Sequence, residues 1–209
     1  MNLTLILFPY LWAAWLAFPV QAGHILQQVI GSPSAGGAAC TASDSFPGTV
    51  LSANWTTTSG SFVVASGQVS GATASAQCIA YYNAVSFSSC TNQSASMVLG
   101  TISGNFIGPG VRMGTGTNIG YDFVNNNGGS FIRYHNGGTN TNIKTCSIVS
   151  TGHTIKLTVS GTTLTAYDNG AEVGGNCHIT DTNLSSGQPG IGGFNNGTSS
   201  AGTWSATSP

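Results

Sequence analysis

The stretch Thr154-Ile-Lys-Leu-Thr-Val-Ser-Gly161, which continues as Thr162-Thr-Leu-Thr-Ala-Tyr-Asp-Asn-Gly170, decides the fold class. Apolar and polar residues alternate from Thr154 to Val159 and again from Thr162 to Tyr167, the period of a β-strand with one buried face. Ser160-Gly161 and Asp168-Asn-Gly170 are turn sequences. The segment therefore predicts consecutive antiparallel hairpins.

Short runs of the same kind recur along the chain. They cover residues 61–65, 118–124 and 130–135, and the last two are separated by Asn125-Asn-Asn-Gly-Gly129, a loop of hairpin length. Apolar spacing of three and four never persists long enough for an ordinary helix. A dozen or so short strands over residues 44–209 predict one all-β domain, an antiparallel two-sheet sandwich.

Two segments precede this domain. Leu3 to Val20 is almost wholly apolar, and Val20-Gln21-Ala22 has the small-residue pattern of a signal-peptidase site. We expect residues 1–22 to be a signal peptide; the alternative is a retained membrane anchor, which Pro9 and Pro19 disfavour as an unbroken helix. Residues 23–43 predict a flexible linker, because Gly31-Ser-Pro-Ser-Ala-Gly-Gly37 has no periodicity and no large side chain. The expected location is secreted or on the cell surface.

Charged side chains are scarce. The chain has four Lys or Arg and five Asp or Glu residues, 4% of the total, with a net charge of −1. Nucleic-acid binding needs several phosphate-neutralising cations on one face, so the composition excludes that class of function. It also excludes electrostatic attachment to a membrane surface.

The five cysteines suit an exported protein. Cys78 and Cys90 flank one short strand–loop–strand tract, and Cys146 and Cys177 flank two probable hairpins. We expect these two pairs to form disulfides, although four cysteines allow three pairings and the sequence alone does not choose among them. Cys40 is then left as a free thiol or a link between chains.

Several motifs resemble the concanavalin A-like lectin/glucanase domains of secreted bacterial and phage proteins. The opening motifs are Asp44-Ser-Phe46, Leu51-Ser-Ala-Asn-Trp55 and Gly60-Ser-Phe-Val-Val64; the closing motifs are Ile155–Gly161, Leu164–Gly170 and Gly187-Gln-Pro-Gly-Ile-Gly192. The resemblance implies a jelly roll of two curved antiparallel sheets, related to laminin G-like modules. It also implies that ligands lie on the concave sheet or in the loops at its rim. The superfamily includes lectins, hydrolases, lyases and structural domains, so fold does not fix activity.

The residues that two kinds of catalysis require can be looked for in the sequence. The Glu-x-Asp-x-x-Glu motif of the superfamily's glycoside hydrolases is absent, and the only glutamate is Glu172. A polysaccharide lyase remains an alternative, because Phe131-Ile-Arg-Tyr-His135 places Arg133 and His135 on one strand face with Tyr121 expected opposite. The competing interpretation pairs Arg133 with Asp122 across the hairpin.

Sugar binding without catalysis requires aromatic faces and amide or hydroxyl groups. The candidate ligand-binding residues are Tyr82, Tyr121, Asn126, Arg133, Tyr134 and His135. Asp44 and Asp181 are candidate calcium ligands that would join early and late segments, and their alternative role is turn capping.

Three functions follow, in decreasing order of support. The first is a secreted, non-catalytic carbohydrate-binding or adhesion domain whose partner is a polysaccharide or a cell-surface glycan. The second is a coat, fibre or appendage subunit that self-associates through sheet edges, since few Lys or Glu residues block edge pairing. The third is the lyase built on Arg133, His135 and Tyr121.

Overall fold

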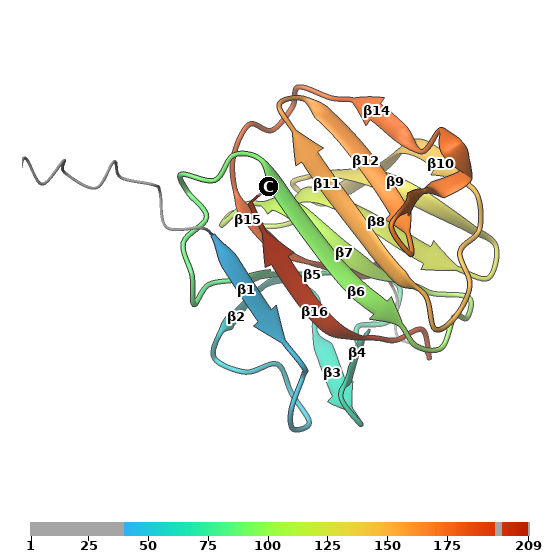
Figure 1. Ribbon diagram of the computed structural model, residues 1–209. Helices are drawn as coiled ribbons and strands as arrows, with labels where there is room; N and C mark the ends of the chain where they lie inside the picture. The colour runs from blue at the N-terminus through green and yellow to red at the C-terminus, as the bar shows by residue number, and fades with distance from the viewer. Residues whose placement is uncertain (1–39, 195–197, 209) are drawn as a thin grey trace, which may run out of the picture. The chain divides into compact units, whose positions relative to one another are not determined.

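Figure 1 shows the computed structural model, which describes residues 40–194 and 198–208. Two antiparallel sheets lie face to face, and the described residues contain no α-helix, only the 3₁₀ turn η1 (Val173–Gly175). The predicted all-β sandwich is therefore confirmed. No helix among the described residues has the length and apolar character needed to cross a membrane.

Sheet A has nine strands. Its main order runs β13, β12, β11, β6, β16, β4 and β3, with β1 paired to β16 and β14 paired to β12. The strands are β1 (Thr41–Asp44), β3 (Phe62–Ala65), β4 (Gln68–Gly71), β6 (Gln93–Leu99), β11 (Thr154–Ser160), β12 (Thr163–Asp168), β13 (Ala171–Glu172), β14 (His178–Thr180) and β16 (Ala201–Thr207). The hairpin expected from the sequence is the β11–β12 pair, in which Val159 faces Leu164.

Sheet B has seven strands in the order β10, β9, β8, β7, β15, β5 and β2. They are β2 (Trp55–Ser59), β5 (Gln77–Tyr82), β7 (Phe106–Met113), β8 (Ile119–Asn126), β9 (Gly129–Asn136), β10 (Thr139–Cys146) and β15 (Gln188–Phe194). The central pair β7–β15 joins residues about 80 positions apart along the chain, for example Phe106 with Phe194. The central strands of this sheet therefore bring distant segments together.

The main core lies between the sheets and is built from the inward-facing residues of every long strand. At one end, Trp55 packs edge to face against Tyr82 and Trp204, with ring centroids 5.3 Å and 4.8 Å apart. Aromatic pairs in this arrangement add about 0.5–1.5 kcal/mol to the energy of burial. Tyr82, predicted as a ligand contact, is instead a core residue with 7% of its surface exposed.

The sandwich begins before residue 44. Strand β1 occupies Thr41–Asp44 and pairs with β16, from Thr41 opposite Thr207 to Asp44 opposite Trp204. The predicted boundary between linker and domain is therefore wrong by several residues, because these four small or polar residues lack the apolar alternation that marks a strand. The predicted signal peptide and most of the predicted linker lie outside the described residues.

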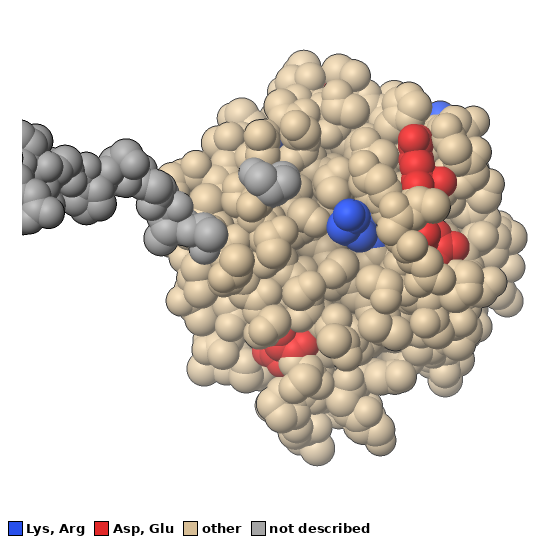
Figure 2. All heavy atoms as spheres, in the orientation of Figure 1, with Lys and Arg blue, Asp and Glu red and all other residues tan. Residues whose placement is uncertain are grey.

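The outward surface of sheet A is almost uncharged. Figure 2 shows this side of the molecule, on which Lys, Arg, Asp and Glu appear only as isolated spots among neutral side chains. Hydroxyl pairs take their place, such as Ser96 and Ser205 with their Oγ atoms 2.9 Å apart. The view contains no basic or acidic patch, in agreement with the composition.

Candidate functional site

Sheet B has an inner face toward sheet A and an outer face away from it. Ile107, Phe123 and Ile191 belong to the core between the sheets. Since side chains alternate along a strand, Phe106, Val124 and Gly192 lie on the outer face. This outer face is the candidate site.

Three phenylalanines gather at one end of the outer face, on strands β7, β9 and β15. Phe106 stands directly opposite Phe194, and the ring centroids are 6.4 Å apart. Phe131 meets Phe106 edge to face at 5.7 Å, and its ring folds back over Gly129, where an added Cβ would lie 2.8 Å from Phe131 Cζ. All three side chains are partly exposed. We call Phe106, Phe131 and Phe194 the aromatic row.

Amide side chains border the aromatic row. The pairing of Ile107 with Asn125 places Phe106 beside Asn126, which is partly exposed and whose Oδ1 accepts a hydrogen bond from Gly128 N at 2.9 Å. On the edge strand β10, the exposed Asn142 and Asn140 stand opposite Arg133 and His135 and so share their face. Aromatic surface next to amide donors and acceptors is thus present on one face.

A buried charged cluster adjoins the row. Arg133 donates from Nε and Nη2 to the two oxygens of Asp122, at 2.9 and 2.6 Å, and its guanidinium lies 5.2 Å from the centre of the Phe106 ring. His135 Nε2 is 2.9 Å from Asp122 Oδ2, and its Nδ1 has no hydrogen-bond partner. All three side chains are at most 1% exposed. Arg133 therefore contacts the aromatic row through a cation–π interaction with Phe106.

Curvature of sheet B explains how these polar groups are covered. Asp122 on β8 and Gly192 on β15 are separated by the intervening strand β7, yet a Cβ at Gly192 would lie 2.7 Å from Asp122 Cβ. Met113 fills the next space, where a Cβ at Gly190 would come within 2.8 Å of its Cγ. Side chains two strands apart meet in this way only on the concave side of a bent sheet. The middle of the outer face is consequently filled by its own residues.

Electrostatics keeps Asp122 ionised. Burial alone would raise the pKa of this carboxyl group, but the charge of Arg133, the charge of His135 and the hydrogen bonds of both residues hold its pKa well below the usual value. A carboxylate in this state neutralises the guanidinium beside it. The charge of Arg133 is therefore compensated within the fold.

The lyase arrangement predicted from the sequence is wrong. Tyr121 pairs in register with Tyr134, faces the core and donates to Asp181, so it does not meet Arg133 and His135. The competing interpretation, a pairing of Arg133 with Asp122, is confirmed. Tyr121 and His135 are fully buried, and the guanidinium of Arg133 is already bound to Asp122 and to the Phe106 ring, so the three side chains do not form a ligand site.

The other predicted ligand residues, Tyr134 and Asn126, lie on opposite faces of sheet B. Tyr134 is partly exposed but packs on the inner side against Tyr121, with ring centroids 5.6 Å apart. Of the predicted set, Asn126 lies on the outer face with part of its surface accessible. The aromatic row was not predicted, although Phe131, Arg133 and His135 alternate on one strand and Phe131 shares their face.

The two candidate calcium ligands have separate structural roles. Asp44 accepts hydrogen bonds from Trp55 Nε1 at 2.8 Å and from Phe46 N at 2.6 Å. Asp181 accepts from the Tyr121 hydroxyl and from Asn183 N, the latter at 2.9 Å. Calcium needs six to eight oxygen ligands, several of them carboxylates, and no cluster of three acids, histidines or cysteines that could hold a metal occurs within 40–194 and 198–208. The residues present therefore do not fit a shared calcium site.

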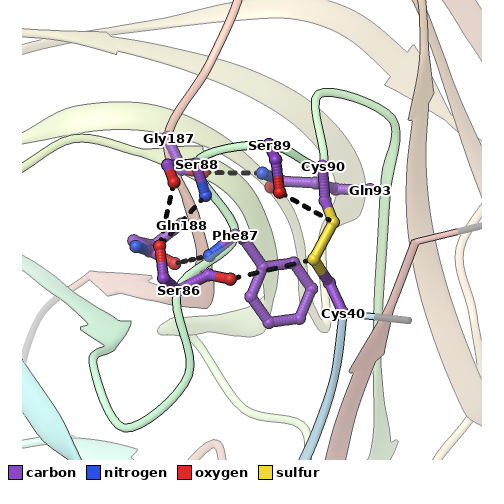
Figure 3. Close-up of a disulfide and its surroundings, with 9 residues drawn as sticks. All are labelled: Cys40, Ser86, Phe87, Ser88, Ser89, Cys90, Gln93, Gly187 and Gln188. Carbon is purple, nitrogen blue, oxygen red and sulfur yellow. Dashed lines mark hydrogen bonds between the residues drawn. A yellow bond between two sulfur atoms is a disulfide. The ribbon is translucent and has the colours of Figure 1, made fainter. Parts of the chain in front are cut away.

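One of the two predicted disulfides is confirmed and the other is wrong. Cys146 is joined to Cys177, as expected, but Cys90 is joined to Cys40, and Cys78 is a buried free thiol. Cys78 points into the main core between the sheets, whereas Cys90 lies in the loop after β5. Figure 3 shows how the Cys40–Cys90 disulfide fixes this loop beside Phe87, whose backbone N–H donates to Gln188 Oε1 at 3.0 Å.

Comparison with known proteins places the fold. No protein-family model matches the sequence, and no curated protein is similar to it. Among solved structures, the carbohydrate binding module CBM66 from Bacillus subtilis has a TM-score of 0.56 at 14% identity, covering 74% of this chain and 92% of the module.

Two further structures agree with this placement. The exoplasmic/lumenal domain of VIP36, in a Ca²⁺/Man3GlcNAc-bound form, has a TM-score of 0.52 at 11% identity, covering 80% of this chain and 88% of that domain. The carbohydrate recognition domain of Emp47p has a TM-score of 0.50 at 10% identity, covering 81% and 95%. The chain has the concanavalin A-like lectin/glucanase jelly-roll fold, and identities this low show the fold alone.

Proposed function

We propose that this protein is an exported carbohydrate-binding domain that binds a glycan on the aromatic row without catalysis. The observation that carries the proposal is the row itself: three partly exposed phenylalanine rings on one sheet face, with Asn126 beside them and the exposed Asn140 and Asn142 farther along the same face. Aromatic rings stack on the apolar faces of sugars, and amides supply directional hydrogen bonds.

The surroundings of the row support the same role. Arg133, held by Asp122, contacts the Phe106 ring and limits its movement, which supports a preorganised platform. Two of the solved structures with this fold are described as a carbohydrate binding module and a carbohydrate recognition domain. The disulfides Cys40–Cys90 and Cys146–Cys177 are compatible with export.

A glycan microarray probed with the full chain tests the proposal, followed by titration of the strongest ligand. We expect Phe194→Ala to weaken binding about 5- to 30-fold, since loss of one stacked ring removes roughly 1–2 kcal/mol. The matched control is Tyr167→Ala, which removes a partly exposed aromatic ring on sheet A that stacks under Lys156 at 4.4 Å. No binding to any neutral or acidic glycan, or equal losses in the two variants, would contradict the proposal.

A second candidate function is assembly through the edge of sheet B. Strand β10 is the terminal strand of that sheet, its first four residues are exposed, and Lys144 is its only charged residue. Edge strands without charged residues pair readily with other chains. Light scattering at rising concentration tests this role: growth that Thr141→Lys abolishes supports it, and a monomer at every concentration contradicts it.

A further inference from the structure

A second polar site lies at the rim of the sandwich, where β7 ends. Gln188 pairs with Met113 and Gly190 with Gly110. Between these two pairs β7 has one residue more than β15, which is a β-bulge. Such a bulge turns a side chain out of the strand's alternation and is common beside functional sites. The residue turned out is Arg112, whose backbone has a positive φ of 50°, an uncommon conformation for a residue other than glycine.

A glycine just before the neighbouring strand β15 permits this conformation. Gly187 has a φ of +148°, and a Cβ added there would lie 2.7 Å from Arg112 Cα. Any side chain at position 187 would push the Arg112 backbone away. The backbone segments at Arg112 and Gly187 therefore approach this closely only because position 187 is glycine.

The Arg112 guanidinium is buried, with 2% of the residue exposed, and all its hydrogen bonds go to backbone carbonyls. Nε and Nη2 donate to Thr91 O at 3.3 and 2.9 Å, Nη1 donates to Leu184 O at 2.7 Å, and Nη2 also donates to Gly161 O at 2.6 Å. A guanidinium has five N–H donors. One Nη1 hydrogen therefore has no acceptor among the described residues.

No carboxylate neutralises this cation within the part of the chain that the structure describes. Asp181 is engaged by the Tyr121 hydroxyl and by Asn183, and the same hydroxyl accepts from Leu184 N at 3.0 Å. Burial lowers the pKa of Arg112, whereas the electrostatic interaction with Tyr121 acts to raise this pKa. A guanidinium nevertheless stays protonated in proteins, so the site keeps an uncompensated positive charge.

Arg112 is also one of the residues that line a pocket at the surface. Arg112 lines a cavity of about 350 Å³ at the rim, together with the hydroxyl-bearing residues Thr91, Thr162, Thr182 and Ser185. This volume lies within the range of small-ligand sites, about 300–1,000 Å³. Hydroxyl groups donate readily to an anion and can also bind the hydroxyls of a sugar.

We propose that this rim pocket binds the carboxylate of an acidic sugar residue, with Arg112 Nη1 and the surrounding hydroxyls as donors. An anion would satisfy the free N–H and neutralise a cation that carbonyl dipoles stabilise only in part. The inference deepens the proposed function and rests on it, because it names the class of glycan: one that carries uronic or similar sugar acids.

Titration with methyl glucuronide and methyl glucoside at equal ionic strength tests the proposal, because the two probes differ only in the carboxylate. We expect the glucuronide to bind the full chain at least tenfold more tightly than the glucoside. Sodium sulfate is the third probe. Equal binding of glucuronide and glucoside, or sulfate binding as tightly as the glucuronide, would overturn the proposal.

The variant Thr162→Asp tests the location. Residue 162 is exposed and lines the pocket, so an aspartate there places a competing carboxylate beside Arg112 without disturbing the core. We expect it to weaken glucuronide binding at least tenfold, whereas the control Thr57→Asp, on the exposed side of β2, leaves binding unchanged. Unchanged binding in Thr162→Asp would also overturn the proposal.

The same variants separate the two proposals. If Phe194→Ala abolishes glycan binding while Thr162→Asp changes nothing, the aromatic row is the glycan site and the rim pocket is not a carboxylate site. If no glycan of either kind binds the wild-type chain, both proposals fail.

Discussion

Two arginines are buried in this protein, and their charges are stabilised in opposite ways. Arg133 lies in regular strand pairing and meets Asp122 through two short hydrogen bonds. Arg112 lies on a bulge and meets carbonyl oxygens from three loops, with no acid among the described residues. The first charge is compensated within the fold, which makes Arg133 a structural residue. The second is left for a ligand to compensate.

The comparison also separates two parts of the sandwich. The Arg133 cluster belongs to the middle of the curved sheet, where Gly192 makes room for Asp122. The Arg112 site belongs to the rim, where the disulfide at Cys90 is adjacent to Thr91, an acceptor for the guanidinium. Stability should therefore depend mainly on the cluster, and ligand response mainly on the rim.

The largest expected effect is on the cluster. Arg133→Met leaves Asp122 as a fully buried carboxylate without its main partner, and breaking a buried ion pair in this way costs about 3–5 kcal/mol. We expect that loss in the free energy of unfolding, measured with urea. The double variant Asp122→Asn/Arg133→Met removes both charges and should be more stable than the single variant. A double variant that is less stable would show that Arg133 does not serve mainly to neutralise Asp122.

The disulfide Cys40–Cys90 should matter next. It spans 50 residues, and removing a bridge of this kind costs about 2–4 kcal/mol. In Cys40→Ser/Cys90→Ser we expect faster hydrogen exchange at residues 86–93 and 187–188, which the bridge and the Phe87–Gln188 bond hold together. Strands β8 and β9 should be accelerated less than these segments, and only through the loss of global stability. Uniform acceleration throughout sheet B would contradict the separation of rim and cluster.

Replacing the rim arginine should cost less than replacing the cluster arginine. Arg112→Met removes hydrogen bonds to three carbonyl groups, but no buried acid is left behind and water in the pocket can replace the lost donors. We expect a loss of about 1–3 kcal/mol in unfolding free energy. Circular dichroism during thermal unfolding measures it, and a loss larger than that of Arg133→Met would reverse the comparison.

Sequence reasoning found the architecture because β patterning is local. Alternation in the β11 and β12 segments, with turn sequences between them, is enough to predict a hairpin sandwich. The pairing of Arg133 with Asp122 was among the alternatives, since both residues lie at fixed positions on adjacent strands of a hairpin.

The candidate sites depend on contacts that no local pattern records. The aromatic row joins Phe106 to Phe194, which are distant in the sequence and meet only because β7 and β15 are neighbours. The Cys40–Cys90 bridge was missed because β1 has no apolar alternation to mark it as a strand. Arg112 was missed because a bulge, not a motif, places this residue beside the rim pocket. Register and sheet order decide these features, and both are properties of the whole fold.

Acid titration also distinguishes the two arginine sites, and near neutral pH its expected effect on the free energy of unfolding is the smallest of these. Asp122 has a lowered pKa in the folded state, so it contributes stability that is fully present above the unfolded pKa and is lost as pH falls toward the folded pKa. With an unfolded pKa of about 3.9, the loss from this group is only about 0.3 kcal/mol at pH 4 and about 1.3 kcal/mol at pH 3. Arg112 remains charged throughout and adds no such slope.

Urea unfolding between pH 3 and pH 6 should therefore show this dependence in the wild type and in Arg112→Met, and should show it reduced in Asp122→Asn/Arg133→Met. An identical pH dependence in all three proteins would mean that the folded cluster does not hold Asp122 ionised.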